Sequence, residues 1–191
     1  MTQQELYINL PRRILNKIKG VMGTYDDKHP TAPQNGFNTY FDGEPFFIAA
    51  SQLPALIVDW QRIDPASAPT GMDKWSHNIV IKVVLNKMDD AGVIDIQGGN
   101  GDIIETPTKK RLENYLFARD ATTGEYLTKT IYGVIRKYFT MDGGEITQSP
   151  IAELGESNRP SNEGGTVSEL PTSEAHVTIT AQELIEVQPR S

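Results

Sequence analysis

A chain of 191 residues is long enough for one domain, and its 38% hydrophobic content can supply a packed core. The formal net charge of −7 argues against a protein that grips nucleic acid by neutralising phosphates. A negative net charge is consistent with a role in solubility alone, and also with an acidic surface that DNA passes without binding. Because the chain contains no cysteine, disulfides, thiolate catalysis and cysteine-based zinc sites are excluded.

Hydrophobic stretches of the length used for targeting or membrane insertion are missing from the sequence. The first residues carry no uninterrupted apolar segment of the kind found in signal peptides. No stretch approaches the ~18 apolar residues that a membrane span needs. We therefore expect a protein that is made and kept in an aqueous phase and has no membrane partner.

The first predicted element is an amphipathic helix over residues 10–22. Its apolar positions recur at steps of three and four residues, and they are Leu10, Ile14, Leu15, Ile18 and Met22. Asn9 can cap the helix, and Gly20 or Gly23 can end it. Lysine and arginine occupy the remaining face, which we expect to meet solvent or a partner.

Strands are predicted for residues 54–62 and 77–86, after a loop-rich region over 24–45. The first is rich in β-branched and aromatic residues and has a proline at its start. In the second, residues alternate between two largely apolar faces, which is typical of a central strand covered on at least one side. Residues 63–74 between them are predicted to be a turn region.

Two helices are predicted within residues 107–139, after strong turn signals over 89–105. Val93, Ile94 and Ile96 can make a short strand among these turns. The pair Thr106-Pro107 is a typical helix start, and a second helical pattern runs from Leu127 to Tyr138. We expect these helices to cover the sheet.

Residues 142–174 are polar and turn-forming, and residues 175–187 alternate as in a strand that returns to the sheet. The predicted fold class is therefore α+β. It has a mixed, mostly antiparallel sheet flanked by helices, in a single domain over 1–191. Residues 142–174 form a long loop or arm inserted before the last strand.

The histidines are not spaced like the ligands of a metal site. His29 lies beside Asp26 and Asp27, where solvated loop charges are far commoner than a metal cluster. His77 and His176 begin predicted strands and are interpreted as polar residues at strand edges. Trp60 and Trp75 flank the best strands, and core packing is favoured over an interface anchor.

Sequence motifs of catalysis are missing as well. The run Gly98-Gly99-Asn100-Gly101-Asp102 is a single imperfect copy of a calcium-binding repeat, so a tight turn is favoured. The chain has no GxSxG, GxxxxGK[ST] or GxGxxG motif, and Asp89-Asp90 is interpreted as solvated turn charge. We predict no catalytic, cofactor-binding or metal-binding residue, and a protein that is not an enzyme and has no cofactor.

The order of these elements resembles that of bacteriophage tail terminator proteins, the family of the minor tail protein U. The resemblance rests on the helix over 10–22, the segment 53–58, the strand over 77–85 and the late helix over 127–138. Together these elements span most of residues 9–187.

The resemblance implies a structural virion protein of the tail or neck, made in the host cytoplasm. It implies a homo-oligomeric hexameric ring that ends growth of the tail tube and joins the tail to the neck or connector. The implied partners are other copies of the chain, the tail tube protein, the neck protein and the sheath. DNA would pass through the lumen without specific binding.

Two alternatives remain open at the level of the sequence. The first is another neck or head–tail connector protein, such as a stopper or completion protein. The second is a small cytoplasmic enzyme or ligand-binding module, which would need a deep pocket with convergent carboxylates of perturbed pKa.

Overall fold

The computed structural model describes residues 10–26, 28, 35–66, 72–93, 106–139, 146 and 150–186. Its helices are α1 (Leu10–Met22), α2 (Pro107–Phe117) and α3 (Ile131–Tyr138), with 3-10 helices η1 (Ala50–Gln52) and η2 (Lys87–Val93). Its strands are β1 (Thr39–Asp42), β2 (Ala55–Ala66), β3 (Met72–Asn86), β4 (Ile151–Glu163) and β5 (Thr166–Glu186).

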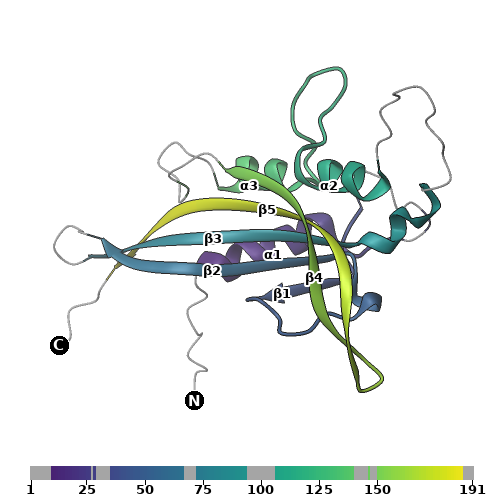
Figure 1. The fold of residues 1–191 in the computed structure, drawn as a ribbon. Coiled ribbons are helices and arrows are strands. Elements are labelled where there is room, and N and C mark those ends of the chain that lie inside the picture. Colours follow the sequence, from purple (N-terminus) through teal and green to yellow (C-terminus); the bar gives the residue numbers. More distant parts are fainter. Residues whose placement is uncertain are drawn as a thin grey trace, which may run out of the picture.

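The strands form one sheet in the order β1-β2-β3-β5-β4. β1 runs parallel to β2, and the other neighbouring pairs are antiparallel. With helices packed against the sheet (Figure 1), this is the predicted α+β class with a mixed, mostly antiparallel sheet. A single domain over 1–191 includes residues outside the described ranges and stays a prediction.

The predicted strands over 54–62, 77–86 and 175–187 all lie in this sheet. The observed strands β2, β3 and β5 are longer than predicted. β2 continues to Ala66 and β3 begins at Met72, so residues 63–66 and 72–74 of the predicted turn are strand, while 67–71 lie outside the described residues. Pro65 lies opposite Trp75 within this extension. The region 24–45, predicted as loop, contains β1. The prolines and glycines of these segments favoured loops, whereas strand pairing overrides such local preferences.

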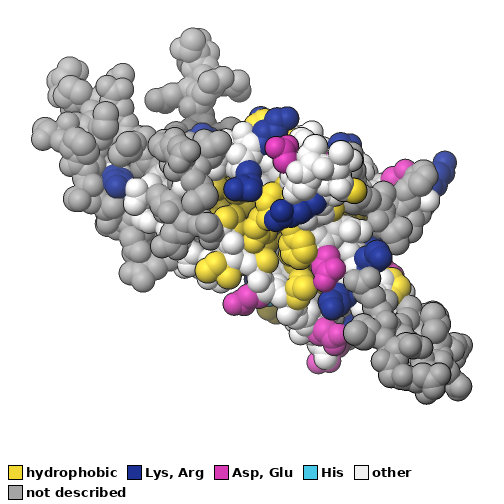
Figure 2. Space-filling model, turned by 90° about the horizontal axis from the view of Figure 1, so that it is seen from above, with side chains coloured by type: hydrophobic (Ala, Val, Ile, Leu, Met, Phe, Trp, Pro, Cys, Tyr) yellow, Lys and Arg dark blue, Asp and Glu magenta, His cyan; other side chains and the backbone are white. Residues whose placement is uncertain are grey.

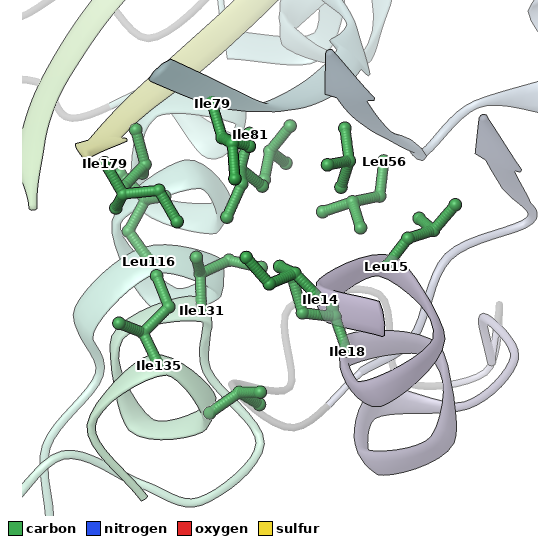
Figure 3. Close-up of a cluster of buried hydrophobic side chains, with 14 of the residues drawn as sticks. Ile14, Leu15, Ile18, Leu56, Ile79, Ile81, Leu116, Ile131, Ile135 and Ile179 are labelled. Atoms are coloured by element: carbon green, nitrogen blue, oxygen red, sulfur yellow. The ribbon is translucent and has the colours of Figure 1, made fainter. Parts of the chain in front are cut away.

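The main core lies between the sheet and the helices. Alternate residues of β3 point from the sheet toward the helices, as the two-residue period predicted, and Ile79 and Ile81 are fully buried (Figure 3). Opposite them lie apolar residues of all three helices, among them Ile14, Ile18, Leu116, Ile131 and Ile135. Burial of these side chains is the dominant favourable contribution to folding.

Local sequence features account for the buried face of α1 and for the start of α3. α1 has the predicted bounds, and its apolar stripe is buried while its basic face is exposed. α3 begins four residues later than its apolar pattern, because the side chain of Thr130 accepts a hydrogen bond from the backbone N–H of Gly133 at 3.0 Å and caps the helix. Leu127 therefore precedes the helix. No described helix is long and apolar enough to cross a membrane.

The opposite face of the sheet is covered by the segment between β1 and β2. Ile48 and Leu53 of this segment pack on Ala55, Ile57 and Val84 of the sheet. A smaller apolar cluster thus lies on the face away from the helices.

The interpretation of residues 142–174 as a loop is wrong for residues 151–174, which form β4 and the first part of β5. β4 pairs with β5 along its whole length, from Ile151 opposite Thr178 to Glu163 opposite Thr166. Gly164 and Gly165 make the two-residue turn with positive φ angles of 60° and 85°. The predicted arm is thus a twisted two-stranded ribbon, which extends beyond the rest of the sheet (Figure 1). Of the positions between α3 and β4, residues 140–145 and 147–149 lie outside the described residues.

Candidate assembly surfaces

The most exposed element of the fold is the hairpin over residues 151–170, here called the arm. Nearly all of its residues are exposed, including three apolar side chains, namely Ile151 (62% exposed), Leu154 (45%) and Val167 (63%). Isolated two-stranded hairpins are at best marginally stable in water. The arm therefore needs anchoring, and it presents surface that no other described element covers.

A buried ion cluster anchors the arm to the sheet. The guanidinium of Arg159 on β4 donates two hydrogen bonds to the carboxylate of Glu174 on β5, at 2.6 and 2.9 Å. Arg159 also pairs with Glu44, which pairs in turn with Lys82 on β3. Only 11% of the Arg159 side chain and 4% of the Glu174 side chain are exposed. The cluster thus joins β3, β4, β5 and the segment after β1.

The pKa values of the acids show how strongly the cluster is paired. Burial raises the pKa of Glu174, but hydrogen bonds from His176 and Arg159 outweigh it and lower the pKa to about 2. Burial likewise raises the pKa of Glu44, and its bonds with Arg159 and Lys82 lower it below its ordinary value. Both carboxylates are therefore ionised at neutral pH. They hold the strands together through ion pairs and do not act as proton donors, which need a raised pKa.

The distal part of the arm is held by the segment between β1 and β2. The backbone N–H of Ile48 donates to the carbonyl of Pro160 at 3.1 Å. The backbone N–H of Ala50 donates to the carboxylate of Glu163 at 2.8 Å. These contacts lie on one side of the ribbon, so its outer side, which includes Val167, stays open.

A second set of polar contacts links the arm to α2. Lys87 pairs with Glu156 of the arm and, at 3.4 Å, with Asp90. Asp90 is buried and accepts hydrogen bonds from the backbone N–H and the side chain of Thr108, at 2.9 and 2.6 Å. The interpretation of Asp89-Asp90 as solvated turn charge is therefore wrong, since Asp90 binds the first turn of α2 and Asp89 pairs with Arg111.

On the helix side, cationic and aromatic side chains alternate over α1, α3 and the loop 118–128. We call this the basic–aromatic surface, formed by Lys17, Arg119, Arg136, Lys137, Tyr126, Tyr132 and Tyr138. Figure 2 shows the face over the helices, with hydrophobic side chains in its middle and Lys and Arg side chains beside them.

Cation–π contacts order this surface. The Nζ of Lys17 lies 4.0 Å from the ring centre of Tyr138, and the guanidinium of Arg119 lies 4.3 Å from that of Tyr126. Arg119 also donates to the hydroxyl of Tyr126 at 2.8 Å. Arg119 and Tyr126 line an open hollow of about 550 Å³, together with Arg136, Lys137 and one acidic residue, Glu125. The surface thus offers positive charge and apolar contact to an extended acidic segment.

The residues singled out from the sequence do not come together in one site. His77 lies buried within β3 and not at a strand edge, while His176 is half-exposed and lies 2.9 Å from Glu174. Trp60 and Trp75 are half-buried, and neither belongs to the two apolar clusters of the described residues. His29 and the glycine-rich run 98–102 lie outside the described residues. Among the residues that are described, no group of His, Asp and Glu has the arrangement of a metal site.

Compared with known proteins, the chain matches no protein-family model, and no curated protein is significantly similar to it in sequence. The features of the chain that bear on its function are therefore the arm, the basic–aromatic surface and the order of the elements.

Proposed function

We propose that the protein is a structural subunit of a bacteriophage tail. It forms a homomeric, hexameric ring at the head-proximal end of the tail tube, ends tube growth and joins the tail to the neck or connector. Its partners are other copies of the chain, the tail tube protein and the neck protein, and in a contractile tail the sheath. This function is inherited from the family resemblance, and the exposed features of the fold support it.

The arm is the observation that carries the proposal. Ordering a ribbon costs roughly 1–2 kcal/mol per backbone residue, and a ribbon exposed on its outer side recovers little of this through burial within one subunit. The exposed parts of Leu154 and Val167 are available for contact with a second molecule. A well-anchored, outward-facing ribbon is the kind of element by which one subunit reaches the next in an assembly.

Ring formation needs two different surfaces on each copy. In a head-to-tail contact, one patch of a subunit meets another patch of its neighbour, and the ring closes when the rotation closes. The arm and the basic–aromatic surface provide two such patches on different elements. The fold is therefore compatible with assembly into a ring.

A particle reconstruction is the direct test. We expect the chain at the junction of tail tube and neck in purified virions, in a closed ring of identical copies. In a reconstituted system, adding the protein to growing tubes should fix their length. A position elsewhere in the neck would favour the stopper or completion alternative, and a chain that never joins particles would end the proposal.

A further inference from the structure

We infer that the arm of one copy docks on the basic–aromatic surface of the next copy. This inference names the contact within the ring and rests on the proposed function. It commits to a second copy of the chain as the occupant, because the same chain carries both halves of a complementary pair.

The charges of the two surfaces are opposite. Residues 151–170 contain four acidic side chains, Glu153, Glu156, Glu163 and Glu169, and one basic side chain, Arg159. Arg159 is turned inward to Glu174 and Glu44, so it does not neutralise the outside of the arm. No described residue pairs with the carboxylates of Glu153 or Glu169, and both residues are exposed.

The basic–aromatic surface complements the arm in charge and in apolar contact. Its four cations, Lys17, Arg119, Arg136 and Lys137, are exposed and lie over tyrosine rings. Tyr138, which is 38% exposed, provides apolar area that suits the exposed Leu154 and Val167. Charge complementarity of this kind steers association and fixes its register.

The distal part of the arm lies away from the basic–aromatic surface of its own subunit. The tip of the hairpin extends past β1 on one side of the sheet, whereas α2 and α3 lie on the other side (Figure 1). The distal part of the arm is also held in place, through Pro160 and Glu163, by the segment between β1 and β2. The contact therefore joins two copies head to tail, the arrangement that a ring requires.

A nucleic acid is the competing occupant of a basic and aromatic surface. The chain as a whole is acidic, with a formal net charge of −7, which opposes the approach of a long polyanion. An acidic arm of a neighbouring copy brings only a few carboxylates and arrives with its apolar side chains. The charge distribution thus favours a protein segment.

The test is a charge swap in the full chain. The arm variant carries Glu153→Lys and Glu169→Lys, and the surface variant carries Arg136→Glu and Lys137→Glu. Self-association is measured by native mass spectrometry and sedimentation at low and high salt. Each variant alone should associate about tenfold more weakly than the wild type, because exposed charge pairs that attract become pairs that repel.

An equal mixture of the two variants should restore association, since each arm then meets a surface of opposite charge. The mixed rings should alternate the two chains and contain equal numbers of each. One chain with all four substitutions should also associate, which shows that the single variants fold. A matched control, Lys19→Glu with Lys28→Glu, reverses two exposed lysines that belong to neither the arm nor the basic–aromatic surface and should leave association unchanged.

Three outcomes would overturn the inference. The wild-type chain could remain monomeric, the arm and surface variants could associate as strongly as the wild type, or their mixture could fail to restore association. Binding of a labelled DNA duplex that only the surface variant loses, with normal self-association, would assign the surface to nucleic acid instead. Rings that form through other contacts would still support the proposed function, whereas absence from particles would refute that function separately.

Discussion

Replacing Glu174 by glutamine tests whether the buried ion cluster stabilises the fold. The substitution keeps the size of the side chain and removes its charge. The ordinary pKa of a glutamate is 4.5, and that of Glu174 in the fold is about 2. Burial opposes this lowering, but the hydrogen bonds from His176 and Arg159 outweigh it.

The magnitude follows from these two pKa values. Each pH unit between them corresponds to about 1.4 kcal/mol, so the ionised form of Glu174 contributes about 3 kcal/mol to the free energy of unfolding. Because the folded-state pKa is lowered, this contribution is fully present above a pH of about 4.5. It is lost as the pH falls through that value towards about 2.

Urea unfolding at pH 7 and at about pH 3, followed by circular dichroism, measures this contribution. Wild type should exceed Glu174→Gln in stability by about 3 kcal/mol at pH 7, and by less than half of that at about pH 3. The control Glu156→Gln, at an exposed ion pair with Lys87, should cost less than about 1 kcal/mol. A difference between wild type and Glu174→Gln that is small at pH 7, or equal at both pH values, would refute the reasoning.

Three further predictions concern the cluster and the helices. Arg159→Met should cost about 3–5 kcal/mol because Glu174 stays buried without its main partner, and adding Glu174→Leu should recover much of this loss in urea unfolding. Gly133→Ala should lower the thermal unfolding midpoint strongly, because the added Cβ would lie 2.1 Å from a backbone oxygen. Gly20→Ala, where the added Cβ meets open space on α1, should instead raise that midpoint. Thr130→Ala should cost about 1 kcal/mol through loss of the α3 cap, and Thr130→Ser should retain most of the stability.

The parts of the fold that could be predicted from the sequence are those that bury one regular face. The stripe of α1 and the alternation along β3 bury their apolar residues against each other, so periodicity alone identifies both elements. The turn prediction over 63–74 is wrong where β2 and β3 extend into it, because it rests on the local preferences of two prolines and one glycine. The pairing of β2 with β3, which extends both strands, depends on residues far along the chain.

The arm was harder to predict because both faces of its ribbon are polar. A strand shows a two-residue period only where one face is buried, and β4 lies almost entirely in solvent. The available signal was the pair Gly164-Gly165 between two segments of similar length, which is typical of a hairpin turn. The residues of the ribbon do not by themselves determine the register in which β4 pairs with β5. The ion cluster at the base of the ribbon helps to fix this register.

The ion cluster has a weak sequence signal that is visible in hindsight. Lys82 lies between Val80 and Val84 on a strand with two largely apolar faces, and a charge at such a position requires a partner. Its partner Glu44 comes from a distant segment, as does Arg159, which pairs with the same carboxylate. The sequence therefore marks the charge without identifying what pairs with it.

The net charge of −7 describes neither surface through which this chain is proposed to assemble. Residues 10–22 and 106–139, which supply the helices, contain 11 basic and 3 acidic residues, so the helix side is basic while the arm is acidic. A chain divided in this way repels copies that approach with like surfaces and attracts copies that approach arm to helix. This arrangement favours head-to-tail contacts over two-fold symmetric ones, and a head-to-tail contact can close into a ring. The separation of charge along the chain thus bears on the symmetry of the proposed assembly more directly than the total charge does.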